Sequence, residues 1–204
     1  MTDEAPAATP PSALKDRLIE LSMELIAKRG WRDWALADLA TESSTGLAAV
    51  YDLYPSKQAI LVAFLRRIDR VMLTPAAGGE EGSARDRLFE VVMRRLDALA
   101  PYKAALRRLT AELPGDPLAA AALAVGLRRS AGWMLESAGI GQSGLIGLVR
   151  VKGLIGVYLA TFRVWLADDQ EDQGQTMAAL DRYLARAELI MNSLPRKGRI
   201  APVG

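Results

Sequence analysis

Hydrophobic residues recur every three or four positions along most of the chain, which predicts α-helices throughout. Alternation typical of strands is nearly absent, and glycine and proline mark the breaks between helices. The first helix is expected over 12–29, with Ser12 as its N-cap and Gly30 just beyond its end. Two short helices, 35–42 and 46–53, should follow, joined by a turn at 43–45.

A longer helix is expected over 57–73, because Pro55 interrupts the preceding segment and Ser56 can cap the next one. Its apolar positions form a broad face: Ile60, Leu61, Phe64, Leu65, Ile68, Val71 and Met72. The stretch 74–83, TPAAGGEEGS, has the composition of a linker. Five further helices are predicted at 84–100, 101–113, 117–138, 143–167 and 172–194.

These elements indicate an all-α protein of two domains. The predicted division is a disordered tail at 1–11, a small domain at 12–57, a connecting helix at 58–73, the linker at 74–83, a larger domain at 84–194 and a second tail at 195–204.

Composition restricts the chemistry open to the 204 residues. The chain contains neither cysteine nor histidine, which excludes thiol nucleophiles, thiolate or imidazole metal sites and the commonest general base. The acidic stretch 168–172 precedes a predicted helix, where the helix dipole favours negative charge, so it needs no catalytic explanation. We therefore expect a binding protein rather than an enzyme, without a metal or cofactor.

The distribution of charge and apolar residues bears on location. The N-terminal residues MTDEAPAATPP carry acids where an export signal needs positive charge. The longest apolar run, 145–166, is interrupted by Arg150, Lys152 and Arg163. These features predict a cytoplasmic protein without an integral membrane segment.

Residues 30–57, GWRDWALADLATESSTGLAAVYDLYPSK, have the spacing of a DNA-binding helix-turn-helix. Its second helix, 46–54, contains no Arg, Lys, Asn or Gln, the side chains that read bases best. Residues 1–57 also carry six basic and nine acidic side chains, a net charge of −3. Because phosphate contacts require the opposite sign, we expect weakened binding to double-stranded DNA.

The same segment resembles the TetR family of bacterial regulators. The resemblance rests on Asp38-Leu39-Ala40, on Tyr51 and on Tyr54-Pro55-Ser56-Lys57. It implies an N-terminal three-helix DNA-binding domain and a C-terminal helical bundle that binds a ligand and forms a homodimer. The usual Ala-Gly-Val-Ser turn is replaced by residues 43–46, in which Ser44 would adopt the glycine-type conformation at some cost.

The resemblance and the predicted helix together identify candidate DNA-contacting residues. In the family, the residues at the positions of Tyr51 and Lys57 touch phosphates, which position a duplex without reading its sequence. On helix 46–53, Leu47, Val50 and Tyr51 follow the i, i+3, i+4 pattern of one helix face. The full candidate set is Thr45, Leu47, Ala48, Tyr51, Asp52, Ser56 and Lys57.

The C-terminal third carries a second resemblance, to the TetR-like lipid-binding proteins of coenzyme Q biosynthesis. It rests on Val157-Tyr158, Val164-Trp165-Leu166 and Leu180-Asp181-Arg182. It implies an alternative function, in which a lipid or isoprenoid carrier has lost specific DNA binding and assists quinone synthesis.

Large and adaptable apolar side chains are concentrated in the C-terminal domain and could surround a small hydrophobic ligand or lipid. The candidate pocket residues are Phe89, Met93, Trp133, Met134, Leu154, Tyr158, Phe162 and Trp165. Arg150 and Lys152 could meet an anionic headgroup, although extension to solvent is the favoured interpretation. A homodimer interface is expected on the small residues of helix 143–167 and on the last helix: Gly153, Gly156, Ala160, Leu180 and Leu184.

Overall fold

The computed structural model describes residues 11–74 and 82–193, and within these ranges the chain is helical and contains no strand. The α-helices are α1 (Pro11–Arg29), α2 (Leu36–Glu42), α3 (Leu47–Leu53), α4 (Lys57–Leu73), α5 (Ala84–Leu99), α6 (Lys103–Glu112), α7 (Pro117–Ser137), α8 (Gly144–Ala167) and α9 (Gly174–Ser193). Short 3₁₀ turns, Ala100–Tyr102 and Leu113–Gly115, flank α6. The all-α prediction is confirmed for these residues, whereas the predicted tails, apart from Pro11, and most of the predicted linker lie outside them.

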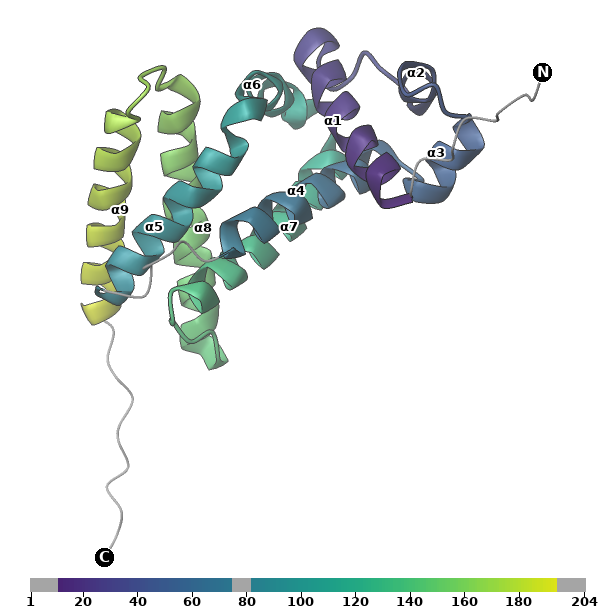
Figure 1. The fold of residues 1–204 in the computed structure, drawn as a ribbon. Helices are drawn as coiled ribbons and strands as arrows, with labels where there is room; N and C mark the ends of the chain where they lie inside the picture. The colour runs from purple at the N-terminus through teal and green to yellow at the C-terminus, as the bar shows by residue number, and fades with distance from the viewer. Residues whose placement is uncertain (1–10, 75–81, 194–204) are drawn as a thin grey trace, which may run out of the picture.

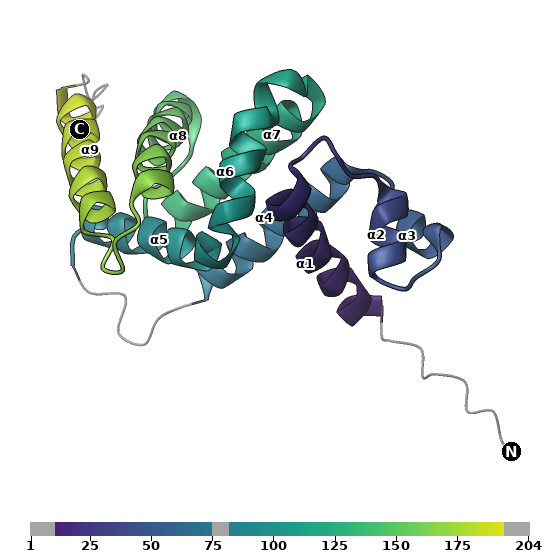
Figure 2. The same ribbon diagram turned by 90° about the horizontal axis from the view of Figure 1, so that it is seen from above.

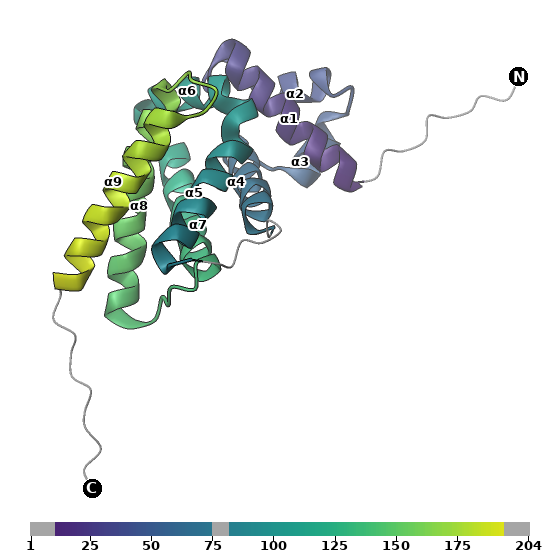
Figure 3. The same ribbon diagram turned by 60° about the vertical axis from the view of Figure 1, so that its left-hand side comes forward.

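The helices are arranged in two groups along an elongated molecule (Figure 1). The first group, α1 to α3, forms one end, and α8 and α9 stand side by side at the other (Figures 2 and 3). Between them, α4 packs along α7 and α5, so α4 belongs to both groups. The helix that follows the helix-turn-helix therefore continues directly into the larger bundle.

Local side-chain chemistry explains where the helices begin. The Ser56 hydroxyl accepts a hydrogen bond from the Ala59 amide at 3.1 Å, which caps α4 as predicted. The N-cap of α2 is Ala35, which forms no side-chain cap, and its amide instead donates to the Asp38 carboxylate at 2.7 Å. Ser44, in the turn between α2 and α3, adopts the left-handed conformation with φ of 55°, as expected from its place in the motif.

The buried face of α4 differs from the predicted one at two positions. Val71, expected in the core, is half exposed, whereas Asp69 is buried together with Phe64, Ile68 and Met72. A buried carboxylate requires partners, and the bundle supplies them.

Asp69 lies at the centre of a buried polar network between four helices. It forms an ion pair with Arg95 of α5, whose side chain is also buried. The Ser130 hydroxyl of α7 donates to the second Asp69 oxygen at 2.9 Å, and Arg95 Nε donates to the Tyr158 hydroxyl of α8 at 3.2 Å. The network thus fastens α4 to α5, α7 and α8 by directional bonds within an otherwise apolar core.

The connection between α8 and α9 is organised by Asp168, the C-cap of α8. Its carboxylate accepts hydrogen bonds from the Thr176 hydroxyl at 2.7 Å and from the Thr176 amide at 2.9 Å. These bonds, the hydroxyl bond above all, lower the pKa of Asp168 below its ordinary value.

Asp168→Asn is expected to lower the thermal unfolding temperature at neutral pH. The difference in unfolding temperature from the wild type should become smaller as the solution is acidified. A carboxyl group with a depressed folded-state pKa contributes stability above its unfolded-state pKa, and that contribution is lost as the pH falls through the folded-state pKa. Thermal unfolding of both proteins between pH 7 and pH 2 measures this difference. A difference that stays constant over that range would show that Asp168 does not act through its charge.

Candidate nucleic-acid interface and ligand cavity

The helix-turn-helix presents one face of α3 to solvent. Val50 is buried, but the exposed fractions of Leu47 and Tyr51 are 51% and 63%. Of the three residues that share the i, i+3, i+4 pattern, Val50 is buried, whereas Leu47 and Tyr51 are accessible to a binding partner. The seven-residue helix α3 packs against the core through Val50 and the half-buried Leu53, which leaves Leu47 and Tyr51 on the surface.

The other predicted DNA-contacting residues divide by their position around α3. Ala48 and Asp52 lie on the exposed side of the helix with Tyr51, and Thr45 is half-buried in the turn before it. Ser56 is half-buried and its hydroxyl is used as the cap of α4. The exposed set offers methyl, phenol and carboxylate groups but no cation.

Lys57 faces the protein rather than solvent. Its ammonium donates to the backbone oxygens of Trp31 and Trp34 and lies 4.5 and 4.4 Å from the centres of their indole rings. Burial lowers the pKa of Lys57, while Asp116 and Glu112 act in the opposite direction. A phosphate contact from Lys57 would require the ammonium to leave these partners, so its assignment as a phosphate ligand stays a prediction.

Several acids near α3 are partly neutralised by ion pairs. Arg29 lies 3.5 Å from both Asp38 and Glu42 of α2. These pairs are solvent-exposed and contribute little to stability. They partly neutralise the acids beside α3 without giving the surface a net positive charge, so weakened DNA binding stays a prediction from the composition.

The loop between α1 and α2 ties the helix-turn-helix to the larger bundle. The Trp31 indole donates to the Asp116 carboxylate at 2.7 Å, and the Arg32 amide donates to Glu112 at 3.0 Å. Asp116 also accepts from the Ala119 amide at 2.9 Å, the bond that caps α7. The position of the DNA-binding-type helices is thereby linked to the connection between α6 and α7.

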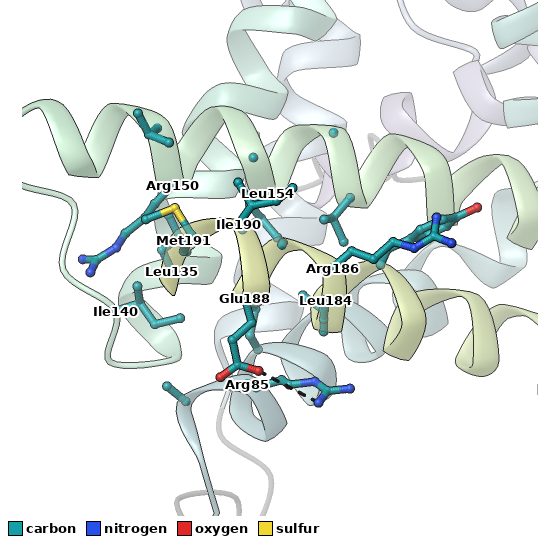
Figure 4. Close-up of a pocket in the computed structure, with 18 of the residues that line it drawn as sticks. Arg85, Leu135, Ile140, Arg150, Leu154, Leu184, Arg186, Glu188, Ile190 and Met191 are labelled. Carbon is teal, nitrogen blue, oxygen red and sulfur yellow. Dashed lines mark ion pairs between the residues drawn. The ribbon is translucent and has the colours of Figure 1, made fainter. Parts of the chain in front are cut away.

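A cavity of about 720 Å³ lies between α5, the end of α7, α8 and α9. Leu88, Leu135, Leu154, Val157 and Leu184 provide its apolar wall. On α8 its lining includes Gly153, Gly156 and Ala160, and beyond the neighbouring backbone of α8 the space where a side chain would begin at either glycine is open. Four charged residues also line it: Arg85, Arg150, Arg186 and Glu188 (Figure 4).

The predicted pocket residues do not surround this cavity, apart from Leu154. Met134, Tyr158 and Trp165 are core residues, and Phe162 stacks between Tyr158 and Trp165 with ring centres 5.9 and 5.4 Å away. Phe89 and Met93 are half-buried against the core, whereas Trp133 is half exposed. Large side chains occupy the space between packed helices and leave no room for a ligand. The cavity therefore forms where the facing side chains are small or of medium size.

The predicted interface residues differ in accessibility. Gly153 and Gly156 are exposed and Ala160 is half-buried, but Leu180 and Leu184 are buried within the protomer. The two leucines therefore hold α9 against its own bundle, and their assignment as interface contacts is corrected. Apolar surface on α8 is instead supplied by Leu145, Ile146, Leu148, Val149 and Leu159, all exposed.

Among the residues that the structure describes, α8 is the one helix long and apolar enough to cross a membrane by length and composition alone. Core helices of soluble proteins meet the same test. Here α8 packs against α9 and α7 within the bundle.

Comparison with solved structures identifies the architecture. A TetR transcriptional regulator from Nitrosomonas europaea superposes with a TM-score of 0.71 at 24% identity, covering 86% of this chain and 98% of that one. A TetR regulator from Rhodococcus gives 0.62 at 18% identity, covering 87% and 97%, and one from Streptomyces coelicolor gives 0.58 at 17%, covering 90% and 83%. The chain therefore has the TetR fold, as its N-terminal motif predicts.

No model of a known protein family matches the sequence, and no curated protein matches it. The comparisons give no support to the resemblance of the C-terminal third to coenzyme-Q-biosynthesis proteins. The carrier function inferred from that resemblance is accordingly not retained.

Proposed function

We propose that this TetR-fold chain is a cytoplasmic transcriptional regulator that binds double-stranded DNA as a homodimer and is controlled by a small hydrophobic ligand. It acts by binding and not by catalysis. The observation that carries the proposal is the outward face of α3, where Leu47, Ala48, Tyr51 and Asp52 of the helix-turn-helix are exposed. Exposure of a large aliphatic and an aromatic side chain on one short helix favours a contact surface.

The homodimer is expected to form through the exposed apolar side of α8. Leu145, Leu148 and Leu159 lie on the side of α8 opposite the buried Leu154, at helical spacing. Covering them by a second copy would place two α3 helices on one duplex, which requires half-sites about 34–36 Å apart.

The effect of ligand binding is expected to reach the helix-turn-helix through α4. Tyr158, which hydrogen bonds to Arg95, follows the cavity-lining Val157 on α8, and Arg95 is paired with Asp69 of α4. A ligand that moves α8 would therefore act on α4 through rigid, directional bonds. The start of α4 in turn adjoins α3 through Tyr54 and Ser56.

Ala48→Glu is expected to weaken binding to DNA from upstream of the gene by about 10-fold or more, because it adds a negative charge on the side of α3 that would face phosphates. Fluorescence anisotropy at 150 mM salt measures the effect. Ala48 is exposed, so the fold should be unaffected.

Ala124→Glu provides the matched control, because Ala124 is an exposed alanine on α7, a helix that is not part of the helix-turn-helix. It adds the same charge and should leave the affinity within about twofold of wild type. Equal affinities for both variants would show that α3 does not contact DNA.

A further inference from the structure

The lining of the cavity between α5, α7, α8 and α9 combines an extended apolar wall with an excess of positive charge. Its lining on α8 runs from Val149 to Ala160, eleven residue steps or about 16 Å of helix. Of its four charged residues, three are arginines and one is Glu188. The length of the cavity suits a single hydrocarbon chain, and its excess of positive charge favours a ligand with an anionic group.

The three arginines are not equivalent. Arg85 is compensated, since its guanidinium lies 2.6 Å from Asp181 and 4.0 Å from Glu188. Within the described residues, neither Arg150 nor Arg186 has a carboxylate within 4.0 Å. Figure 4 shows Arg150 and Arg186 toward opposite ends of the drawn lining residues. Two uncompensated cations therefore border an apolar cavity.

Arg150 is the better placed of the two to hold an anion. Its side chain is half-buried, and Nη1 donates to the Gly141 carbonyl at 2.7 Å, which fixes the guanidinium at the end of the cavity beside Ile140. A guanidinium has five N–H donors, so a single bond to a carbonyl leaves it able to bind an anion. Arg186, in contrast, is solvent-exposed, where an ion pair is worth little.

We propose that this cavity binds a single-chain amphiphile with an anionic head, held by Arg150, and with its apolar chain along Leu154, Val157 and Leu184. A carboxylate and a phosphate monoester share the chemistry that the guanidinium recognises. Gly153 and Gly156 leave the chain room to lie against the backbone of α8, because nothing occupies the space beside them. This proposal rests on the proposed function in naming the class of ligand that controls it.

The test is isothermal titration calorimetry of the full chain, without DNA, against decanoate, decyl phosphate and decyltrimethylammonium below their micellar concentrations. We expect one site per chain for an anionic amphiphile and binding of the cation that is about 10-fold weaker or more, since hydrogen bonds to charged groups are lost. Binding of both decanoate and decyl phosphate would identify negative charge as the recognised feature. Binding of only one of them would identify its head group, carboxylate or phosphate, as the recognised feature. Equal affinity for cation and anions would overturn the proposal.

Two variants locate the ligand. Arg150→Gln should weaken anion binding by about 10-fold and leave cation binding unchanged, whereas Arg186→Gln, the matched control on the same cavity, should change anion binding less than threefold. Gly153→Leu should abolish binding of every amphiphile, because its side chain enters open space in the cavity. Its helix content by circular dichroism should match the wild type. Wild-type anion affinity in either Arg150→Gln or Gly153→Leu would refute the site.

Because no DNA is present, loss of this ligand site and loss of DNA binding are separate results. Ligand binding without DNA binding would overturn the regulator and leave the cavity assignment intact. DNA binding without amphiphile binding would overturn the cavity assignment and leave the regulator intact.

Discussion

Asp69→Ala is expected to lower the free energy of unfolding by about 3–5 kcal/mol, because it leaves the buried guanidinium of Arg95 without its counter-charge. The side chains of Arg95 and Asp69 are 1% and 7% exposed, so solvent cannot replace the missing carboxylate. Ser130 would lose its acceptor on Asp69 as well. Urea denaturation followed by circular dichroism, at one fixed protein concentration, measures the change.

The double variant Asp69→Leu, Arg95→Met separates the loss of a partner from the loss of the pair. Removing both charges together leaves no unpaired buried ion, so this variant should be more stable than Asp69→Ala. If the single variant retains wild-type stability, Arg95 must find another partner, and the network does not fasten α4 to the bundle. Such a result would remove the proposed route from the cavity to the helix-turn-helix.

Trp31→Ala is expected to cost about 3–5 kcal/mol of unfolding free energy, the range for truncating a buried tryptophan. Trp31 is 1% exposed and packs edge-to-face against Trp34 with ring centres 6.0 Å apart. Its loss also removes one of the two rings beside Lys57 and the indole donor to Asp116. The same urea titration measures the effect.

Two controls accompany the Trp31 experiment. Trp31→Phe keeps the aromatic packing but loses the donor to Asp116, so it should cost about 1–2 kcal/mol. Trp133→Ala removes a tryptophan of which 49% is exposed, so it should cost clearly less than Trp31→Ala. Similar losses for Trp31→Ala and Trp133→Ala would show that the loop does not anchor the helix-turn-helix.

The helices could be predicted closely from the sequence because their ends depend on local chemistry. Pro55 and Ser56 place the start of α4 at Lys57, where the structure has it. Asp116 and Pro117 do the same for α7. The backbone conformation of Ser44 is likewise determined locally, since the turn of the motif requires a residue in the left-handed region.

The sites were harder to predict because they depend on which neighbours meet each helix face. Periodicity on α3 marks Leu47 and Tyr51 as apolar but cannot show that nothing packs over them. Lys57 fits the phosphate-binding motif, and its engagement by Trp31 depends on a loop 26 residues earlier in the chain. The cavity is lined mainly by residues of α8, among them Gly153, Gly156 and Ala160, and by residues of α9, whereas size alone favours the aromatic residues that fill the core.

Whether this protein regulates transcription is decided by the fluorescence anisotropy of the wild-type protein with DNA from upstream of its gene and with a scrambled duplex, at 50 and 150 mM salt. Regulation by specific binding predicts a clear preference for the upstream fragment that persists at 150 mM salt, where sequence-independent phosphate contacts weaken. Equal binding to both duplexes that is lost at 150 mM salt would contradict the claim. The helix-turn-helix would then be a structural element of a protein that acts through its C-terminal cavity.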